Sequence, residues 1–389
     1  MNTRELDAKY IAGTYARFPV VLTHGKGSVV WDEDGKEYID MGSGIAVNAF
    51  GIADAEWISA VMAQLGRLQH SSNLYFTEPD ALLAEQLCSR TGMKKVFFAN
   101  SGAEANECAI KCARKYAADK YGAENRYKII TLVNSFHGRT VTTLAATGQE
   151  EYHKLFQPLT PGFLYAEAND CEALRAMVEA DPAVAGIMFE LVQGEGGVLP
   201  LDKGFVECIA SLCAERDILM ICDEVQTGNG RTGSLYAWQQ FGIVPDIMTT
   251  AKGLGGGLPI GACLMGEKVK DTMTPGTHGS TFGGNPAVCA GALNILSRID
   301  DALLASVREK SAYLVNELSG ASGVESVAGM GLMLGIKTVK PVDEVVAACR
   351  ENGVLVLTAH GKVRLLPALN IPMELVEKAA AVIKAACAE

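Results

Sequence analysis

The sequence predicts an α/β protein built around a mainly parallel sheet. Five short apolar runs of strand length recur between residues 96 and 252, and segments with an apolar residue every three or four positions lie between several of them. This alternation is typical of a layer in which crossover helices connect parallel strands. The 389 residues are enough for two or three domains, and the 41 glycines indicate many tight turns or ligand-hugging loops.

The expected elements can be placed in chain order. Residues 28–40 alternate around Asp34-Gly35, a turn signal that predicts a β-hairpin. Helices are expected at 54–68 and at 78–90, where Pro79 stands near the start. The apolar runs predict strands at 96–100, 128–136, 185–192, 217–225 and 246–252, and the helical periodicity predicts helices at 101–120, 171–180 and 203–216.

After about residue 290 the pattern changes to that of a smaller α+β unit. A long helical stretch at 286–319 leads to the apolar run 325–338, a helix near 342–352 and a second apolar run at 354–369. The N-terminal hairpin is expected to pack with this unit, since both flank the α/β block. We therefore expect residues 1–50 and 290–389 to form a small domain and residues 51–289 to form a large one.

Composition and charge exclude several classes of protein. The net charge is −11 and there is no basic tract, so a nucleic-acid partner is not expected. The first ten residues are polar, and no apolar run approaches the roughly 20 residues that a membrane span needs. We therefore expect no secretion signal and no membrane span, and a cytoplasmic location.

The 11 cysteines are expected to be small buried hydrophobes in a reducing compartment. No C-x-x-C pair occurs, and a disulfide framework is improbable at this chain length. Cys108 and Cys112 are one helical turn apart, but no nearby histidine completes a ligand set, so no metal site is expected.

Polar side chains gather where the five predicted strands end. In parallel sheets, ligands bind at the carboxyl ends of the strands, so these endings belong to one candidate site. The endings are Asn100-Ser101-Gly102-Ala103, Ser135-Phe136-His137-Gly138-Arg139, Glu190 with Gln193-Gly194-Glu195, Asp223-Glu224-Val225-Gln226, and Lys252-Gly253.

Each ending admits a structural and a chemical interpretation. Ser101 and Glu104 form a capping-box pattern, while the N–H groups at 101–103 could bind a phosphate. Asp223 closes a hydrophobic strand and needs a partner, either a basic side chain or a cationic ring nitrogen. Lys252 follows an apolar strand, where a lowered pKa would make it a nucleophile rather than a solvated surface lysine.

Aromatic and basic side chains complete the set. Phe136 and His137 could stack on a flat cofactor or simply fill the core. Arg139 presents a planar fork suited to a carboxylate, and Arg364 pairs either with a protein carboxylate such as Glu195 or with a ligand. Pyridoxal 5′-phosphate requires this combination of groups: a phosphate site, a stacking ring, a carboxylate for a ring nitrogen and a nucleophilic lysine.

The chain resembles the class III aminotransferases, a family of fold-type I pyridoxal-phosphate enzymes. The resemblance spans essentially the whole chain and rests on motifs in family order, FFANSGAEANECAIKCARKY, SFHGRT, QGEGGV, DEVQTGNGRTG, AKGLGGGLPIGA and HGSTFGGNP. It implies a large domain with a mainly parallel seven-stranded sheet, a smaller α+β domain from both termini, and transfer of an ω-amino group between amino and keto acids.

The resemblance also assigns roles to residues. Lys252 matches the lysine that bonds to the cofactor aldehyde and Asp223 the partner of the pyridine nitrogen; both are expected to be catalytic. The expected cofactor-binding residues are Ser101, Gly102, Ala103, Phe136, His137, Asp223, Val225, Gln226, Lys252 and Thr281. The expected substrate-binding residues are Tyr15, Arg139, Glu195, Ser280 and Arg364.

Three implications of the resemblance concern assembly and specificity. Thr281 matches a residue that reaches the phosphate of the neighbouring subunit's cofactor, which implies a homodimer. Glu195 and Arg364 match a pair that opens to admit 2-oxoglutarate. Gly44 stands where relatives acting on a free α-amine tend to carry an aromatic ring, so it leaves room for an acylated amine. An aminomutase or racemase on the same fold and a non-enzymatic binding protein are the alternatives.

Overall fold

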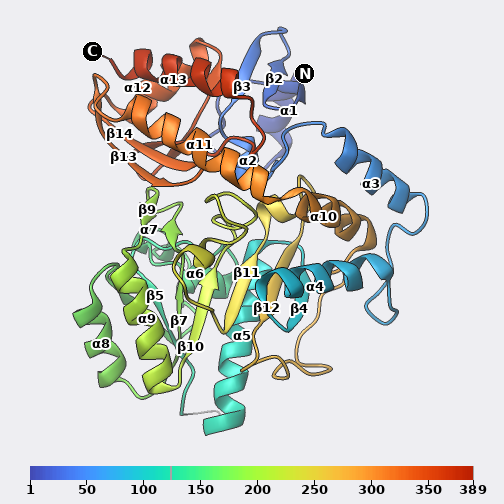
Figure 1. Ribbon diagram of the computed structural model, residues 1–389, viewed down its shortest axis with the longest axis vertical. Coiled ribbons are helices and arrows are strands. Elements are labelled where there is room, and N and C mark those ends of the chain that lie inside the picture. Colours follow the sequence, from blue (N-terminus) through green and yellow to red (C-terminus); the bar gives the residue numbers. More distant parts are fainter. Residues whose placement is uncertain (123–124, 389) are drawn as a thin grey trace.

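The computed structural model describes residues 1–122 and 125–388, and its central feature is a seven-stranded sheet (Figure 1). The strand order is β4-β12-β11-β10-β7-β5-β6, and only β12 runs antiparallel to its neighbours. The mainly parallel α/β sheet predicted from the sequence is confirmed. The strands are β4 (Lys95–Ala99), β5 (Lys128–Leu132), β6 (Phe163–Ala166), β7 (Val184–Phe189), β10 (Leu219–Asp223), β11 (Ile247–Thr250) and β12 (Gly261–Met265).

Helices cover both faces of this sheet, which explains why its strands are apolar on both sides. In β10, Met220 and Cys222 pack into the core cluster that contains residues of α9, while Leu219 and Ile221 pack into the cluster that contains residues of α5. Successive strand residues point to opposite faces, so both sets are buried. The surrounding helices are α3 (Ala55–Leu65), α4 (Glu78–Thr91), α5 (Gly102–Tyr121), α8 (Cys171–Ala180), α9 (Lys203–Arg216) and α10 (Pro286–Arg298).

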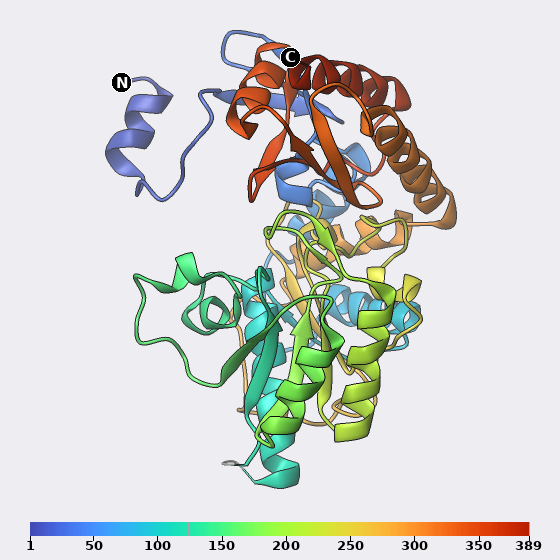
Figure 2. The ribbon, with the colours of Figure 1, turned by 90° about the vertical axis from the view of Figure 1, so that its left-hand side faces the viewer.

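Both ends of the chain contribute to a smaller unit above the sheet in Figures 1 and 2. The strands of the predicted hairpin pair around Asp34-Gly35, and β15 near the C-terminus pairs in parallel with the second hairpin strand, β3. The expected contact between the two ends of the chain is therefore present, while the domain boundaries near 50 and 290 stay a prediction. One sheet holds β1 (Leu22–Lys26), β2 (Val29–Asp32), β3 (Glu37–Asp40) and β15 (Val354–Leu355); the other holds β13 (Val324–Met330), β14 (Met333–Thr338), β16 (Leu357–Ala359) and β17 (Lys362–Leu365).

The remaining elements are the N-terminal helix, three helices of the small unit and several short segments. Helix α1 stands away from the body of the protein in Figure 2 and buries no residue. The small unit is covered by α11 (Asp301–Leu318), α12 (Val342–Glu351) and α13 (Met373–Cys387). The short elements are α1 (Thr3–Tyr10), α2 (Ser43–Ala46), α6 (Val141–Ala146), α7 (Glu150–His153), β8 (Val192–Gln193), β9 (Leu199–Pro200) and the 3₁₀ turns Ala237–Gln240 and Lys252–Leu254.

Two expectations from the sequence are wrong. The helical stretch 286–319 is two helices, because Ile299 leaves the helical conformation and Asp300 caps the next helix with its side chain. The cysteines are not all unpaired, since Cys171 at the start of α8 forms a disulfide with Cys208 of α9, with a Cα–Cα distance of 6.1 Å. The two helices pack side by side on one face of the sheet, so residues 37 positions apart come into bonding range.

Among the described residues, no helix combines the length and the apolar character that a bilayer crossing requires.

An ion pair joins the start of α3 to the end of α10. Asp54 caps α3 by accepting the N–H of Trp57 at 2.9 Å, and its two oxygens lie 2.6 and 2.9 Å from the guanidinium nitrogens of Arg298. That guanidinium also lies 3.9 Å from the ring centroid of Phe50. The hydrogen bond with Arg298 lowers the pKa of Asp54, so the carboxylate stays charged at neutral pH.

We predict that Asp54→Ala lowers the free energy of unfolding by about 2 kcal/mol, because it removes both the helix cap and the ion pair. Asp54→Asn keeps a capping oxygen and should cost about half as much. Urea unfolding followed by circular dichroism measures both values. Glu56→Ala removes an exposed carboxylate 3.5 Å from the same arginine and is the control; an equal loss there would contradict the prediction. Because the pKa of Asp54 is lowered on folding, its contribution is present at neutral pH and is lost as the pH falls through the folded-state pKa.

Candidate active site

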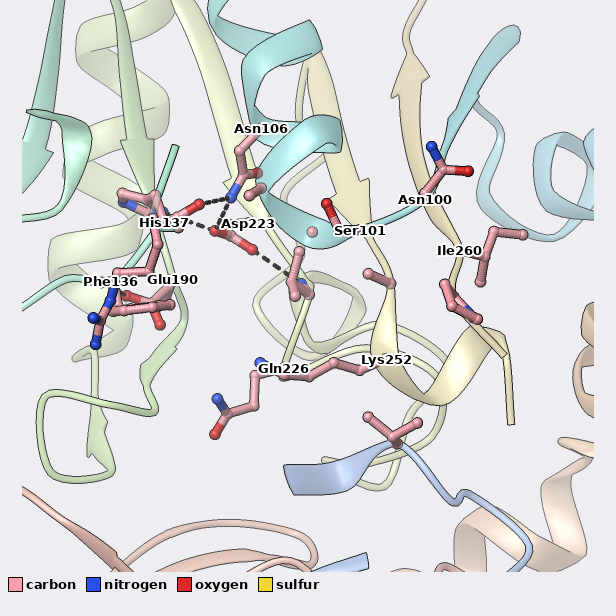
Figure 3. Close-up of a pocket in the computed structure, with 18 of the residues that line it drawn as sticks. Asn100, Ser101, Asn106, Phe136, His137, Glu190, Asp223, Gln226, Lys252 and Ile260 are labelled. Carbon is pink, nitrogen blue, oxygen red and sulfur yellow. Dashed lines mark hydrogen bonds and ion pairs between the residues drawn. The ribbon is translucent and has the colours of Figure 1, made fainter. Parts of the chain in front are cut away.

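The five strand endings line one cavity of about 440 Å³ (Figure 3). Asn100, His137, Glu190, Asp223 and Lys252 each come from the carboxyl end of a different strand of the large sheet. The structure thus brings side chains from all five endings together, while their roles stay a prediction. The cavity is also lined by Val47, Ser101, Gly102, Ala103, Asn106, Phe136, Gly138, Arg139, Val225, Gln226, Ala251, Gly257, Leu258, Pro259 and Ile260.

The N-terminus of α5 forms one wall of the cavity. Ser101 caps this helix by accepting the N–H of Glu104 at 3.2 Å, and Glu104 in turn accepts the N–H of Asn100 at 2.7 Å, one residue earlier than in a capping box. The first N–H groups of a helix have no intrahelical acceptor and favour an anion. A Cβ on Gly102 would lie 2.6 Å from Val225, so glycine keeps this wall open.

A buried carboxylate lies at the centre of the cavity floor. One oxygen of Asp223 accepts hydrogen bonds from His137 Nδ1 at 2.7 Å and from Asn106 Nδ2 at 2.8 Å, and the other accepts the N–H of Val225 at 3.0 Å (Figure 3). Burial alone would lower the pKa of His137, but the hydrogen bond and charge of Asp223 outweigh it and raise the pKa. The carboxylate is therefore held in place and suited to pair with a cationic ring nitrogen.

Lys252 projects from the end of β11 into the same cavity. Its backbone φ of 45° is rarely adopted by a residue with a side chain, and such strain gathers at functional sites. Within the part of the chain that the structure describes, its amine makes no hydrogen bond or ion pair. Burial lowers the pKa of Lys252, against the opposing charges of Glu195 and Asp223. A lysine in these surroundings can act as a nucleophile and as a proton carrier.

Glu190 is the second buried carboxyl of the cavity. It accepts the N–H of Phe136 at 2.9 Å and that of Gly194 at 3.3 Å. Burial raises the pKa of Glu190 to about 7. Its hydrogen bond fixes the chain at Phe136, whose ring lines the cavity as expected.

Arg364 and Glu195 form the ion pair expected from the sequence. Arg364 Nη1 on β17 lies 2.6 Å from Glu195 Oε1, in the turn between β8 and β9, and the arginine is almost fully buried. Burial would raise the pKa of Glu195, but the charge and hydrogen bond of Arg364, together with the charge of Lys252 and the hydrogen bond from Gln226, outweigh burial and lower the pKa. Gln226 bridges the pair, donating to Glu195 and accepting from Arg364 at 3.3 Å each. A Cβ on Gly194 would lie 2.3 Å from Gln226 Oε1, so glycine at this position leaves the bridging amide room.

Five expected site residues do not line this cavity: Tyr15, Ser280, Thr281, and the Glu195–Arg364 pair, which contacts the lining residue Gln226. Tyr15 is 74% exposed on the N-terminal segment, and Thr281 is exposed as well. Ser280 lies nearer, because its hydroxyl accepts a hydrogen bond from Asn100 at 3.2 Å. Gly44, which belongs to a turn with positive φ from Ser43 to Ala46, does not line the cavity either.

The cavity residues that were not found from the sequence include Asn106 and Val47. Asn106 holds Asp223, and it lies four residues after Gly102 on α5. That spacing places both on one face of the helix, a signal that could have found it. Val47 follows a turn with positive φ, and no spacing rule predicts the position of a residue after such a turn.

Comparison with known proteins identifies the family. The family profile described as Aminotransferase class-III matches residues 10–387. The chain is 51% identical over 382 residues to the acetylornithine aminotransferase of Haemophilus ducreyi. The aligned region covers 98% of this chain and 97% of that protein.

Solved structures agree with this assignment. The N-acetylornithine aminotransferase of Stenotrophomonas maltophilia superposes with a TM-score of 0.85 at 36% identity, covering 98% of this chain and 97% of that one. The ornithine aminotransferase of Toxoplasma gondii, a structure with partial occupancy of pyridoxal phosphate at the active site, superposes with a TM-score of 0.93 at 33% identity, covering 98% and 93%. The chain therefore belongs to the class III aminotransferases, a family of pyridoxal-phosphate-dependent enzymes.

Proposed function

We propose that this protein transfers the δ-amino group of N2-acetyl-L-ornithine to 2-oxoglutarate, giving N-acetyl-L-glutamate 5-semialdehyde and L-glutamate, a step of arginine biosynthesis. Two relatives that are 51% and 45% identical to this chain are acetylornithine aminotransferases, which supports this substrate. The observation that carries the proposal is the cavity, in which Lys252 and Asp223 lie together and whose lining residue Gln226 bridges the closed Glu195–Arg364 pair.

The residues present fit pyridoxal 5′-phosphate as cofactor. The N-terminus of α5 at Ser101, Gly102 and Ala103 would hold the phosphate, and Asp223 would hold the pyridine nitrogen. The Phe136 and Val225 side chains would enclose the ring, and His137 would act through Asp223. Gln226 would lie near the 3′-oxygen, and Lys252 would bond to the aldehyde. When bound, this cofactor stabilises the negative charge left on the substrate carbon that loses a proton.

The roles of the protein groups follow from their charge states. Lys252, with its lowered pKa, would accept and return the substrate proton at Nζ. Arg139 would bind the α-carboxylate of the amine donor through its planar fork. Glu195 would keep Arg364 occupied while the donor is bound, and release of Glu195 would free Arg364 for a carboxylate of 2-oxoglutarate.

We further propose that the enzyme is a cytoplasmic homodimer. Thr281 would reach the phosphate in the neighbouring site, Ser280 would approach the substrate, and Tyr15 would face the substrate. Exposed apolar side chains around Thr281 support an interface, because Leu74, Phe76 and Phe282 are 88%, 107% and 60% exposed. Apolar surface of this kind marks contact sites between proteins.

Free ornithine is the second candidate donor, because the Toxoplasma structures that superpose closely carry that name. Succinylornithine, succinyl-diaminopimelate and 4-aminobutyrate are further ω-amine donors for such a site, and an aminomutase or racemase would need no keto acid. The resemblance supports an acylated donor, because Gly44 stands where ornithine aminotransferases tend to carry an aromatic ring; Gly44 itself lies outside the cavity.

We predict that N2-acetyl-L-ornithine alone, without a keto acid, rapidly removes the visible absorption band of the purified holoenzyme. Free ornithine should react at least about tenfold more slowly, because its α-ammonium charge would lie beside Arg139. Stopped-flow absorbance measures both rates. Lys252→Ala is the control and should lack the band of the lysine-bound cofactor. Faster reaction with ornithine would reassign the substrate, and a wild-type protein without any visible band would refute the cofactor assignment.

We predict that Arg364→Ala raises KM for 2-oxoglutarate by about tenfold to a hundredfold, because a charge-assisted hydrogen bond to a carboxylate is lost. KM for the amine donor should change little. Steady-state kinetics with each substrate varied in turn make the comparison. Arg216→Ala removes an exposed arginine paired with Glu179 and is the matched control. An unchanged KM for 2-oxoglutarate in Arg364→Ala would contradict the assigned role.

A further inference from the structure

Arg139, which lines the cavity, and Arg364, which lies behind the lining residue Gln226, are held in different ways. Arg364 Nη1 donates a hydrogen bond to Glu195, whereas Arg139 makes no ion pair and no hydrogen bond among the described residues. The guanidinium carbon of Arg139 instead lies 4.0 Å from the ring centroid of Tyr152 and 5.4 Å from that of Phe136. Of these two rings, Tyr152 is therefore the closer support for this cation.

Tyr152 is itself fixed to the strand ending that carries Arg139. It lies in α7, where its N–H donates to the carbonyl of Gln149 at 3.1 Å, and the Gln149 side chain donates to the carbonyl of Ser135 at 3.1 Å. The neighbouring His153 is buried, and its Nε2 bonds to the carbonyl of Thr147 at 2.7 Å. These bonds tie α7 to the segment that begins at Ser135.

A second contact joins Tyr152 to the cavity wall. The rings of Phe136 and Tyr152 meet edge to face, with centroids 6.2 Å apart and an interplanar angle of 78°. Aromatic pairs prefer this arrangement, which restricts the rotation of both rings. The aromatic face beneath Arg139 therefore has a defined orientation.

We propose that Tyr152 is a positioning residue for substrate recognition: its ring holds the Arg139 guanidinium by a cation–π contact and leaves the N–H groups free for the carboxylate of the amine donor. This inference rests on the proposed function, in which Arg139 binds that carboxylate. A ring face attracts the cation without accepting its N–H groups, so the five donors remain available. A carboxylate in the place of Tyr152 would compete with the substrate, as Glu195 does at Arg364.

The test compares Tyr152→Leu, which removes the ring, with Tyr152→Phe, which keeps it. Tyr152→Leu should raise KM for N2-acetyl-L-ornithine by about threefold to thirtyfold, with kcat within about twofold. Tyr152→Phe should stay within about twofold of the parent enzyme in both constants. Tyr152→Met is a second ring-free variant in case the leucine variant does not fold. The absorbance of the bound cofactor and the thermal midpoint should not change.

A double-mutant cycle then shows whether Tyr152 acts through Arg139. In an Arg139→Ala background, adding Tyr152→Leu should change KM for the donor by no more than about twofold, because the cation that the ring supports is already gone. Phe156→Leu removes an exposed aromatic ring from the same segment and is the matched control. Its KM for the donor should equal that of the parent enzyme.

The outcomes separate this inference from the proposed function. If Arg139→Ala raises KM for the donor and Tyr152→Leu does not, the positioning role of Tyr152 is wrong and the proposed function stands. An equal defect in Tyr152→Phe and Tyr152→Leu, or a full effect of Tyr152→Leu in the Arg139→Ala background, also overturns the inference. If Arg139→Ala leaves KM for the donor unchanged, both the role of Arg139 and that of Tyr152 are refuted.

Discussion

The buried carboxylate of Asp223 is the constraint around which the site is arranged. It ends β10, the middle strand of the seven-stranded sheet, and is only 3% exposed. A charge in such a place costs several kcal/mol unless it is paired and hydrogen-bonded. The partners come from two other elements, His137 from the segment after β5 and Asn106 from α5. The ends of β5 and β10 and the first turns of α5 are therefore fixed relative to one another by a single carboxylate.

Burial also sets the protonation of the groups around Asp223. It lowers the pKa of Lys252 and raises the pKa of Glu190 to about 7, two opposite directions with one cause, because burial disfavours the charged form of each group. Each of these groups can therefore accept or release a proton nearer to neutral pH than it could in water. The low polarity of the cavity raises the free-energy cost of burying the Asp223 charge, and it also makes Lys252 more reactive.

Sequence reasoning found the site better than it found the complete sheet. The strand endings at Asp223 and Lys252 were visible because a polar residue after an apolar run is a local signal. Strand β12 (Gly261–Met265) was missed, since its short apolar run follows a glycine-rich segment and is antiparallel to its neighbours. Two contacts were missed because local patterns do not encode tertiary packing. The Cys171 disulfide depends on how α8 packs on α9, and the contact of Tyr152 with Arg139 depends on where α7 lies.

The two arginines show how one cavity could serve two substrates in turn. Arg364 lies on β17 of the small unit and is held by a carboxylate, so its availability depends on where Glu195 lies. Arg139 lies in the segment after β5 of the large sheet, over aromatic rings, so its donors are available wherever Glu195 lies. Arg364 can bind a substrate carboxylate only when Glu195 moves away, whereas Arg139 can bind one at any time. Movement of Glu195 would therefore raise the number of arginines available for substrate carboxylates from one to two. Under the proposed function, the donor needs one such site and 2-oxoglutarate has two carboxylates, so the same cavity would discriminate between them by charge.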